Sequence, residues 1–191
     1  MRTFVLMIAL AAAGCQHGEV SHVRSEHSPY VGEESREIKA LSNDDVQGYL
    51  DGAGLGFAKV AELNGYPGPR HVLDLADSLD LTAEQRVVVE ESFRSMKREA
   101  QELGAQLVET ERQLDRLFSD GEPSATAVRG LSEIASQLTG RIRYTHLAAH
   151  LKMVEVLTLD QVATYARLRG YGSMGHDGDH SIQDHDQGQG E

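Results

Sequence analysis

The chain has 191 residues, a formal net charge of −12, 5% aromatic residues and no tryptophan. This length suits one domain, and the low aromatic content favours an elongated helical protein with a thin core over a compact globule. The acidic excess lies towards the two ends while residues 64–171 are nearly balanced, so the chain lacks the basic face that nucleic-acid binding requires.

The chain begins with the features of an export signal. A two-residue positive start precedes an apolar run over residues 3–13, which is too short to span a membrane. The run leads to Cys15, the only cysteine, and resembles the bacterial lipobox, with Ala12 where a larger aliphatic residue is usual. The resemblance implies that residues 1–14 are a lipoprotein signal peptide, that Cys15 is lipidated, and, from Gln16, that the destination is the outer membrane. Export with ordinary cleavage and a free thiol is the alternative.

The next part of the chain predicts a tether and a first helix. Residues 15–42 are polar and predict a flexible tether. An amphipathic pattern over residues 43–63 then predicts a helix, on which Gly48, Gly52 and Gly56 would form a ridge for close approach of another helix. A cluster of glycine and proline ends this segment, and a short helix is expected after it, over residues 70–78.

The phrase Leu-Thr-x-x-Gln occurs twice, with Thr82 and Gln85 in the first copy and Thr158 and Gln161 in the second. Each copy has the spacing of a capping box, in which the Thr hydroxyl accepts from a free backbone N–H and the Gln side chain reaches back to the Thr N–H. Two helices are therefore predicted to begin at these threonines.

Between the two phrases lie two long apolar-periodic segments, 82–118 and 124–156, separated by a break at Asp120–Pro123. Apolar residues alternate at steps of three and four, which indicates a heptad seam against another helix. A short loop between two long helices makes them antiparallel neighbours. The sequence thus predicts an all-α domain over residues 43–171, built on a long antiparallel helical hairpin with short flanking helices, and a disordered tail over residues 172–191.

Histidine spacing indicates a metal site on the second long helix. His146 and His150 are four residues apart and Met153 follows one turn later, a set that suits Zn, Cu or Ni better than Mg or Ca. A third ligand would come from His71 or Glu62 if the N-terminal segment folds back. The alternative is that His146 and Met153 pack in the seam and His150 flanks it on the surface.

The tail offers a second place for metal. Its histidines His176, His180 and His185 alternate with aspartates, a composition that binds Zn, Ni or Cu loosely without folding. A solvated acidic tail is the alternative.

The paired Leu-Thr-x-x-Gln motifs on a helical hairpin behind an export signal resemble the Spy/CpxP-type periplasmic superfamily, which includes heavy-metal-resistance sensors of the CnrX and ZraP type. The resemblance covers residues 66–169. It implies an all-α hairpin, often dimeric and without catalytic activity, whose members either hold unfolding clients without ATP or bind metal and report it to a signalling partner. The slightly acidic body departs from the basic cradle of the chaperone members.

These observations together predict a non-enzymatic periplasmic protein, lipid-anchored to the outer membrane, that binds or senses heavy metals or protects against stress. An ATP-independent chaperone and a structural lipoprotein docking module are the alternatives. The expected partners are unfolded clients or an envelope signalling protein, the membrane through the lipid anchor, and a second copy of the chain. No cofactor is obligatory, and no nucleophile elbow supports catalysis.

Overall fold

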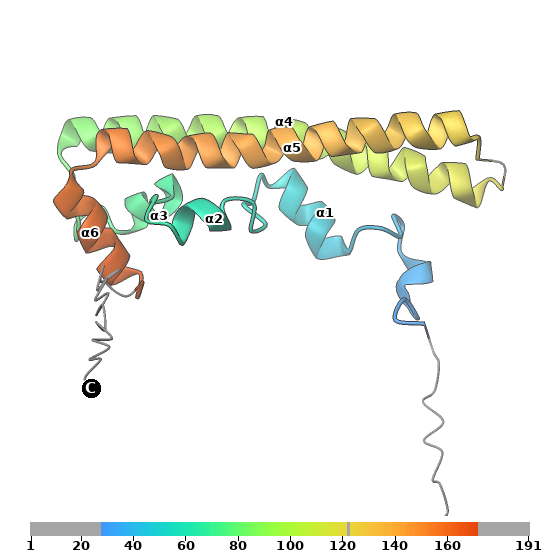
Figure 1. Ribbon diagram of the computed structural model, residues 1–191, viewed down its shortest axis with the longest axis horizontal. Helices are drawn as coiled ribbons and strands as arrows, with labels where there is room; N and C mark the ends of the chain where they lie inside the picture. The colour runs from blue at the N-terminus through green and yellow to red at the C-terminus, as the bar shows by residue number, and fades with distance from the viewer. Residues whose placement is uncertain (1–27, 122, 172–191) are drawn as a thin grey trace, which may run out of the picture. The chain divides into compact units, whose positions relative to one another are not determined.

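The computed structural model describes residues 28–121 and 123–171, and this part of the chain is helical and contains no strand (Figure 1). The all-helical prediction is thereby confirmed. The chain divides into two units, residues 1–34 and 35–191, and helices α1 to α6 all belong to the second unit. The signal peptide, Cys15 and the tail over residues 172–191 lie outside the described residues.

Two long helices, α4 (Ala83–Ser119) and α5 (Ala125–Val156), pack against each other and carry the rest of the second unit (Figure 1). Ser124 caps α5 through a hydrogen bond from the Ala127 N–H. The Gln85 side chain donates to the Val156 carbonyl at 2.9 Å, which shows that the start of α4 lies beside the end of α5. The predicted pair of packed long helices is therefore present.

Apolar side chains of the predicted seam lie in two buried clusters along this pair of helices. The central cluster joins α4 to α5 through Leu103, Leu107, Ala135, Leu138 and Ile142, all buried. Each fully buried aliphatic side chain of this kind stabilises the fold by about 1.5–3 kcal/mol relative to exposure.

The second cluster lies where α3 (Pro69–Asp74), α4, α5 and α6 (Leu159–Leu168) meet. Its buried members are Val72, Leu79, Val89, Met153, Leu157 and Tyr165. The end of the helix pair is thus closed by residues from segments that are far apart in the sequence.

Both Leu-Thr-x-x-Gln motifs form complete capping boxes, and the two boxes are joined. Thr82 caps α4 and Thr158 caps α6, each with its glutamine bonded back to the threonine N–H. The amides of Gln85 and Gln161 also pair reciprocally, at 2.9 and 3.0 Å. Gln161 additionally donates to the Leu79 carbonyl at 3.1 Å. The starts of two helices are therefore fastened to each other through one amide pair.

The helix predicted over residues 43–63 is wrong as a single element. The structure has α1 (Asn43–Leu50) and α2 (Lys59–Glu62), separated by a turn in which Gly52, Leu55 and Gly56 have φ of +64°, +43° and +78°. Left-handed backbone interrupts a right-handed helix, so the predicted ridge of glycines does not form. At Gly52 a side chain would also meet α4, because a Cβ would lie 2.7 Å from the Lys97 carbonyl oxygen.

The packed part of the chain begins before Asn43. Ile38 is 3% exposed, and the Lys39 backbone N–H and ammonium both bind Asp115 of α4, at 3.0 and 3.1 Å. Ser42 forms the capping box of α1 with Asp45. Among the described helices, none combines the length and the hydropathy that crossing a bilayer requires.

Candidate functional site

A cavity of about 560 Å³ lies where the N-terminal segment crosses α4 and α5. Three histidines that the sequence singled out, His71, His146 and His150, line it together. We call it the histidine cavity. Its remaining lining residues come from the turn after α1, from α3 and from α4: Asp51, Gly52, Ala53, Gly54, Ala58, Gly68, Pro69, Arg70, Phe93, Met96 and Lys97.

The His150 ring is held in one orientation by the backbone. Its Nδ1 lies 2.7 Å from the Tyr66 carbonyl oxygen, and the residue is 8% exposed. A carbonyl only accepts, so Nδ1 carries a proton and Nε2 is the ring nitrogen left for a ligand. The Nε2 atom faces Gly68, where a Cβ would approach it to 3.0 Å. Glycine at this position therefore keeps space open beside the free nitrogen.

His146 lies one helical turn earlier on α5. It is 4% exposed, and its Nε2 is buried without a hydrogen-bond partner. Phe57 stacks on the ring at 6.4 Å. Burial first, and then the neighbouring His150, lower the pKa of His146 against the opposing effect of the Ala53 backbone, so the ring is neutral at pH 7.

The two rings together form a preorganised pair of nitrogen donors. Residues four apart lie on one face of a helix, and the Nδ1 atom of His150 is engaged with the Tyr66 carbonyl. Metal-binding histidines have such outer partners, which fix the ring and leave the other nitrogen for the ion. The unpartnered Nε2 of His146 is also a costly group to bury, and a bound ligand would remove that cost.

The other predicted ligands are placed differently. Met153 is fully buried in the cluster between α3 and α6 and does not line the histidine cavity. His71 lines the cavity, but its Nδ1 lies 3.5 Å from Asp74. Over residues 28–121 and 123–171, no three side chains of His, Cys, Asp or Glu converge closely enough to form a metal-binding group. His176, His180 and His185 lie outside the described residues.

Glu62 does lie against α5, which was the condition for its being a third metal ligand. It forms a polar cluster beside His150. Its Oε1 accepts from the hydroxyls of Tyr165 and Tyr171, at 2.6 and 2.9 Å, and from Arg169 Nε at 3.3 Å. Its Oε2 is buried, lacks a hydrogen-bond partner and lies 3.8 Å from His150 Nδ1. We call Glu62, Tyr165, Arg169 and Tyr171 the Glu62 cluster.

The charges of the Glu62 cluster follow from these contacts. Burial by itself would raise the pKa of Glu62, but the two tyrosine hydrogen bonds, His150 and Arg169 outweigh it and the pKa is lowered. Burial and the Glu62 carboxylate raise the pKa of Tyr165, which therefore remains a donor. The carboxylate stays ionised and ties α2 to α6. Sequence reasoning missed both tyrosines and Arg169, because they follow no motif or period.

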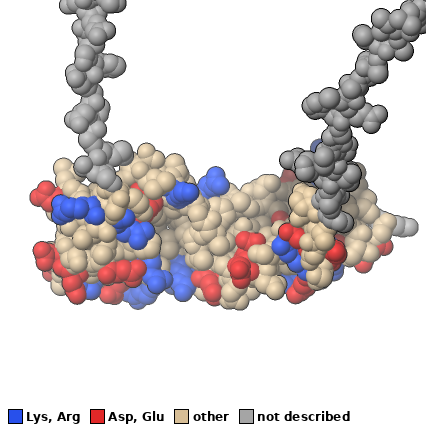
Figure 2. All heavy atoms as spheres, turned by 90° about the horizontal axis from the view of Figure 1, so that it is seen from below, with Lys and Arg blue, Asp and Glu red and all other residues tan. Residues whose placement is uncertain are grey.

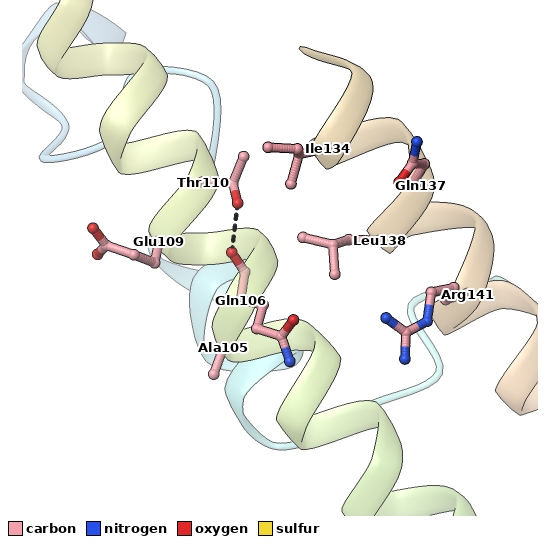
Figure 3. Close-up of a pocket in the computed structure, with 8 residues that line it drawn as sticks. All are labelled: Ala105, Gln106, Glu109, Thr110, Ile134, Gln137, Leu138 and Arg141. Atoms are coloured by element: carbon pink, nitrogen blue, oxygen red, sulfur yellow. Dashed lines mark hydrogen bonds between the residues drawn. The ribbon is translucent and has the colours of Figure 1, made fainter. Parts of the chain in front are cut away.

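A second hollow lies on the seam between α4 and α5, away from the histidines (Figure 3). It measures about 570 Å³, with Ile134 and Leu138 as apolar lining and Arg141 at one side. Thr110 contributes no free hydroxyl proton there, because it donates to the Gln106 carbonyl at 2.8 Å. Gln106, Glu109 and Gln137 also line this hollow, so its surface mixes polar and apolar side chains.

No protein-family model, curated protein or solved structure matches this chain.

Proposed function

We propose that this chain is a metal-binding protein of the bacterial envelope that takes up a divalent ion such as Zn, Cu or Ni through His146 and His150. The observation that carries the proposal is the pair of buried imidazoles on one cavity, of which His150 has its Nδ1 on the Tyr66 carbonyl and His146 has an Nε2 without a partner. Imidazole nitrogen suits this group of ions. The proposal assigns binding and no catalytic step.

The scaffold supports such a role because both donors lie on a rigid element. α5 is one helix of 32 residues, and His146 and His150 lie between its two apolar clusters. We propose that the long helices act as a helical hairpin, on which the N-terminal segment closes the site. The lipobox-like sequence at Cys15 supports export and anchoring of the domain to the outer membrane, where an envelope signalling protein would be the partner.

The test is the melting temperature of the full chain with Zn²⁺, Cu²⁺ or Ni²⁺. An ion that binds only the folded state at a hundredfold excess over its Kd adds about 2.7 kcal/mol of stability. For a domain of this size that is a rise of roughly 5–10 °C. The rise is expected to disappear in the double variant His146→Gln/His150→Gln.

The matched control replaces His176, His180 and His185 of the tail with glutamine. An ion held equally well by the folded and the unfolded chain gives no shift, so this variant is expected to keep the rise. An unchanged melting temperature of the wild type in all three metals would refute the proposal.

The second candidate is an ATP-independent chaperone, and the exposed apolar side chains of the α4–α5 surface favour it. Val88, Ile134 and Tyr144 are 38%, 46% and 70% exposed beside hollows between the two helices. On the face seen in Figure 2, acidic and basic side chains are interspersed and no broad patch of one sign forms. Unfolding clients would be held by apolar contact with these exposed side chains.

Light scattering of a reduced, aggregating client tests this candidate. An excess of the chain is expected to suppress aggregation, and Tyr144→Ser/Ile134→Ser is expected to weaken the suppression. Unchanged scattering with the wild-type chain would eliminate the chaperone activity.

A further inference from the structure

The histidine cavity is much larger than a metal ion needs. Its volume of about 560 Å³ lies within the range of roughly 300–1,000 Å³ in which protein pockets hold small organic molecules. A single water molecule takes about 30 Å³ of liquid volume. An ion with a few waters would therefore leave most of the cavity to another occupant.

The protein also supplies too few donors to surround an ion. Four ligands are usual for Zn²⁺, yet the described residues bring only His146 and His150 together with free nitrogens. Glu62, the nearest carboxylate, directs Oε1 to two tyrosines and Arg169. At least two coordination positions are thus left for ligands from solution.

The remaining side chains of the cavity select the charge of such a ligand. Lys97 of α4 and Arg70 of α3 both line the cavity, and Lys97 forms no ion pair with any described residue. Arg70 forms an ion pair with Asp74, Nε to Oδ2 at 3.5 Å, and its guanidinium lies over the Phe93 ring. Asp51 also lines the cavity, and Arg70 is partly neutralised by Asp74, so Lys97 is the lining cation that remains available to an anionic group of a ligand.

The apolar lining selects the kind of anion. Phe93 and Met96 give the cavity an apolar wall beside the two cations. A carbon skeleton packs against such a wall, whereas inorganic phosphate has none. Guanidinium and ammonium groups bind carboxylate oxygens through charge-assisted hydrogen bonds. The cavity therefore matches an organic carboxylate rather than a mineral anion.

From these observations we infer that the ion is bound as a chelate with a small organic polycarboxylate, in a ternary complex. His146 and His150 hold the ion through Nε2, the carboxylates of the chelator fill the open positions, and Lys97 and Arg70 bind its outer oxygens. This inference rests on the proposed metal binding. It adds the second ligand and two residues, Lys97 and Arg70, that metal binding alone does not require.

The test uses Zn²⁺ and radiolabelled citrate with the full chain, followed by gel filtration. One citrate per chain is expected to co-elute when Zn²⁺ is present, and none when Zn²⁺ is omitted. Radiolabelled phosphate added with Zn²⁺ in place of citrate is expected not to co-elute. Lys97→Gln is expected to weaken citrate retention roughly tenfold, the effect of losing one charge-assisted hydrogen bond, while Zn²⁺ added alone still raises the melting temperature. Lys152→Gln is the matched control, since that lysine pairs with Glu155 and lies outside the cavity.

The two proposals fail in different ways. If Zn²⁺ alone stabilises the chain and citrate merely strips it away, the ternary complex is refuted and the metal site remains. If neither Zn²⁺ nor its citrate complex stabilises or co-elutes with the chain, both proposals fall. Retention of zinc citrate by His146→Gln/His150→Gln would also overturn both, because the ion would then lie elsewhere.

Discussion

At the scale of single residues, the site is made by polar atoms that the fold buries in defined states. His146 presents an Nε2 without a partner, His150 is held by the Tyr66 carbonyl at Nδ1, and Glu62 presents a carboxylate with one oxygen engaged and one unpartnered. Buried polar atoms normally find partners, so the two unpartnered atoms, Glu62 Oε2 and His146 Nε2, distinguish these residues from the rest of the described chain.

Glu62→Gln is expected to destabilise the domain by about 2 kcal/mol at pH 7, because three donors lose a charged acceptor. The pKa of Glu62 is lowered on folding, so its stabilisation is complete above the unfolded value, about 4.3, and is lost as pH falls through the folded value. Urea unfolding from pH 7 to pH 3 measures this effect. The gap between wild type and variant is expected to narrow below about pH 4, and a gap that stays constant with pH would contradict the assignment.

The residue scale also shows the limit of spacing arguments. The i,i+4 pair His146 and His150 was recognisable from sequence because helix geometry places both on one face. Met153 has the same spacing logic, yet it enters the apolar cluster between α3 and α6. A helix face is wider than a metal site, so periodicity identifies the face and tertiary packing decides which members reach the cavity.

At the scale of elements, helix starts were the most predictable feature and the broken N-terminal segment the least. The threonine caps depend on side chains only three residues apart, so local sequence determines them. The turn after α1 depends on left-handed backbone at Leu55 as well as at two glycines, and a leucine gives no sequence signal for that conformation. The pairing of the two capping boxes is a tertiary contact that neither motif predicts by itself.

Gln85→Ala is expected to destabilise the domain by about 2–3 kcal/mol, since it removes a cap and leaves the Gln161 amide without its partner. Thermal unfolding measures it. Gln106→Ala is the control, because Gln106 lies on the same helix and its side chain bonds only the carbonyl one turn earlier. Equal losses in the two variants would show that the amide pair contributes nothing.

Helix packing predicts that replacing a glycine by alanine changes the stability in opposite directions at Gly104 of α4 and Gly140 of α5. Gly104→Ala is expected to destabilise, because its Cβ would lie 2.2 Å from the Tyr49 carbonyl oxygen and α1 would have to shift. Gly140→Ala, with nothing within 4 Å of its Cβ, is expected to stabilise by about 1 kcal/mol through helix propensity. Denaturant midpoints of the two variants give the answer, and a shift of the same sign in both would contradict the packing.

At the scale of the whole second unit, stability depends on two apolar clusters connected by α4 and α5. Heptad spacing indicated which residues of the long helices are inside, and Leu103, Leu107, Leu138 and Ile142 follow it, whereas Gly104 and Val108 are buried off that spacing. The cluster where α3, α4, α5 and α6 meet could not be predicted from heptad spacing. It brings together Val72, Val89 and Tyr165, which span nearly a hundred residues of sequence.

Because both clusters use the same two helices, unfolding is expected to be a single cooperative transition. Leu103→Ala in the central cluster and Val72→Ala in the other are each expected to lower the midpoint, with a cost of about 2–5 kcal/mol for the leucine. Circular dichroism and tyrosine fluorescence are expected to report coincident curves in both variants. Separate transitions by the two probes would show that the clusters fold independently.

The reciprocal amide pair of Gln85 and Gln161 also has an evolutionary consequence. Each glutamine gives the other both a donor and an acceptor, so a mutation at one position removes the advantage of keeping the other. In descendants of this chain the two codons are therefore expected to be retained together or lost together, although 75 residues separate them.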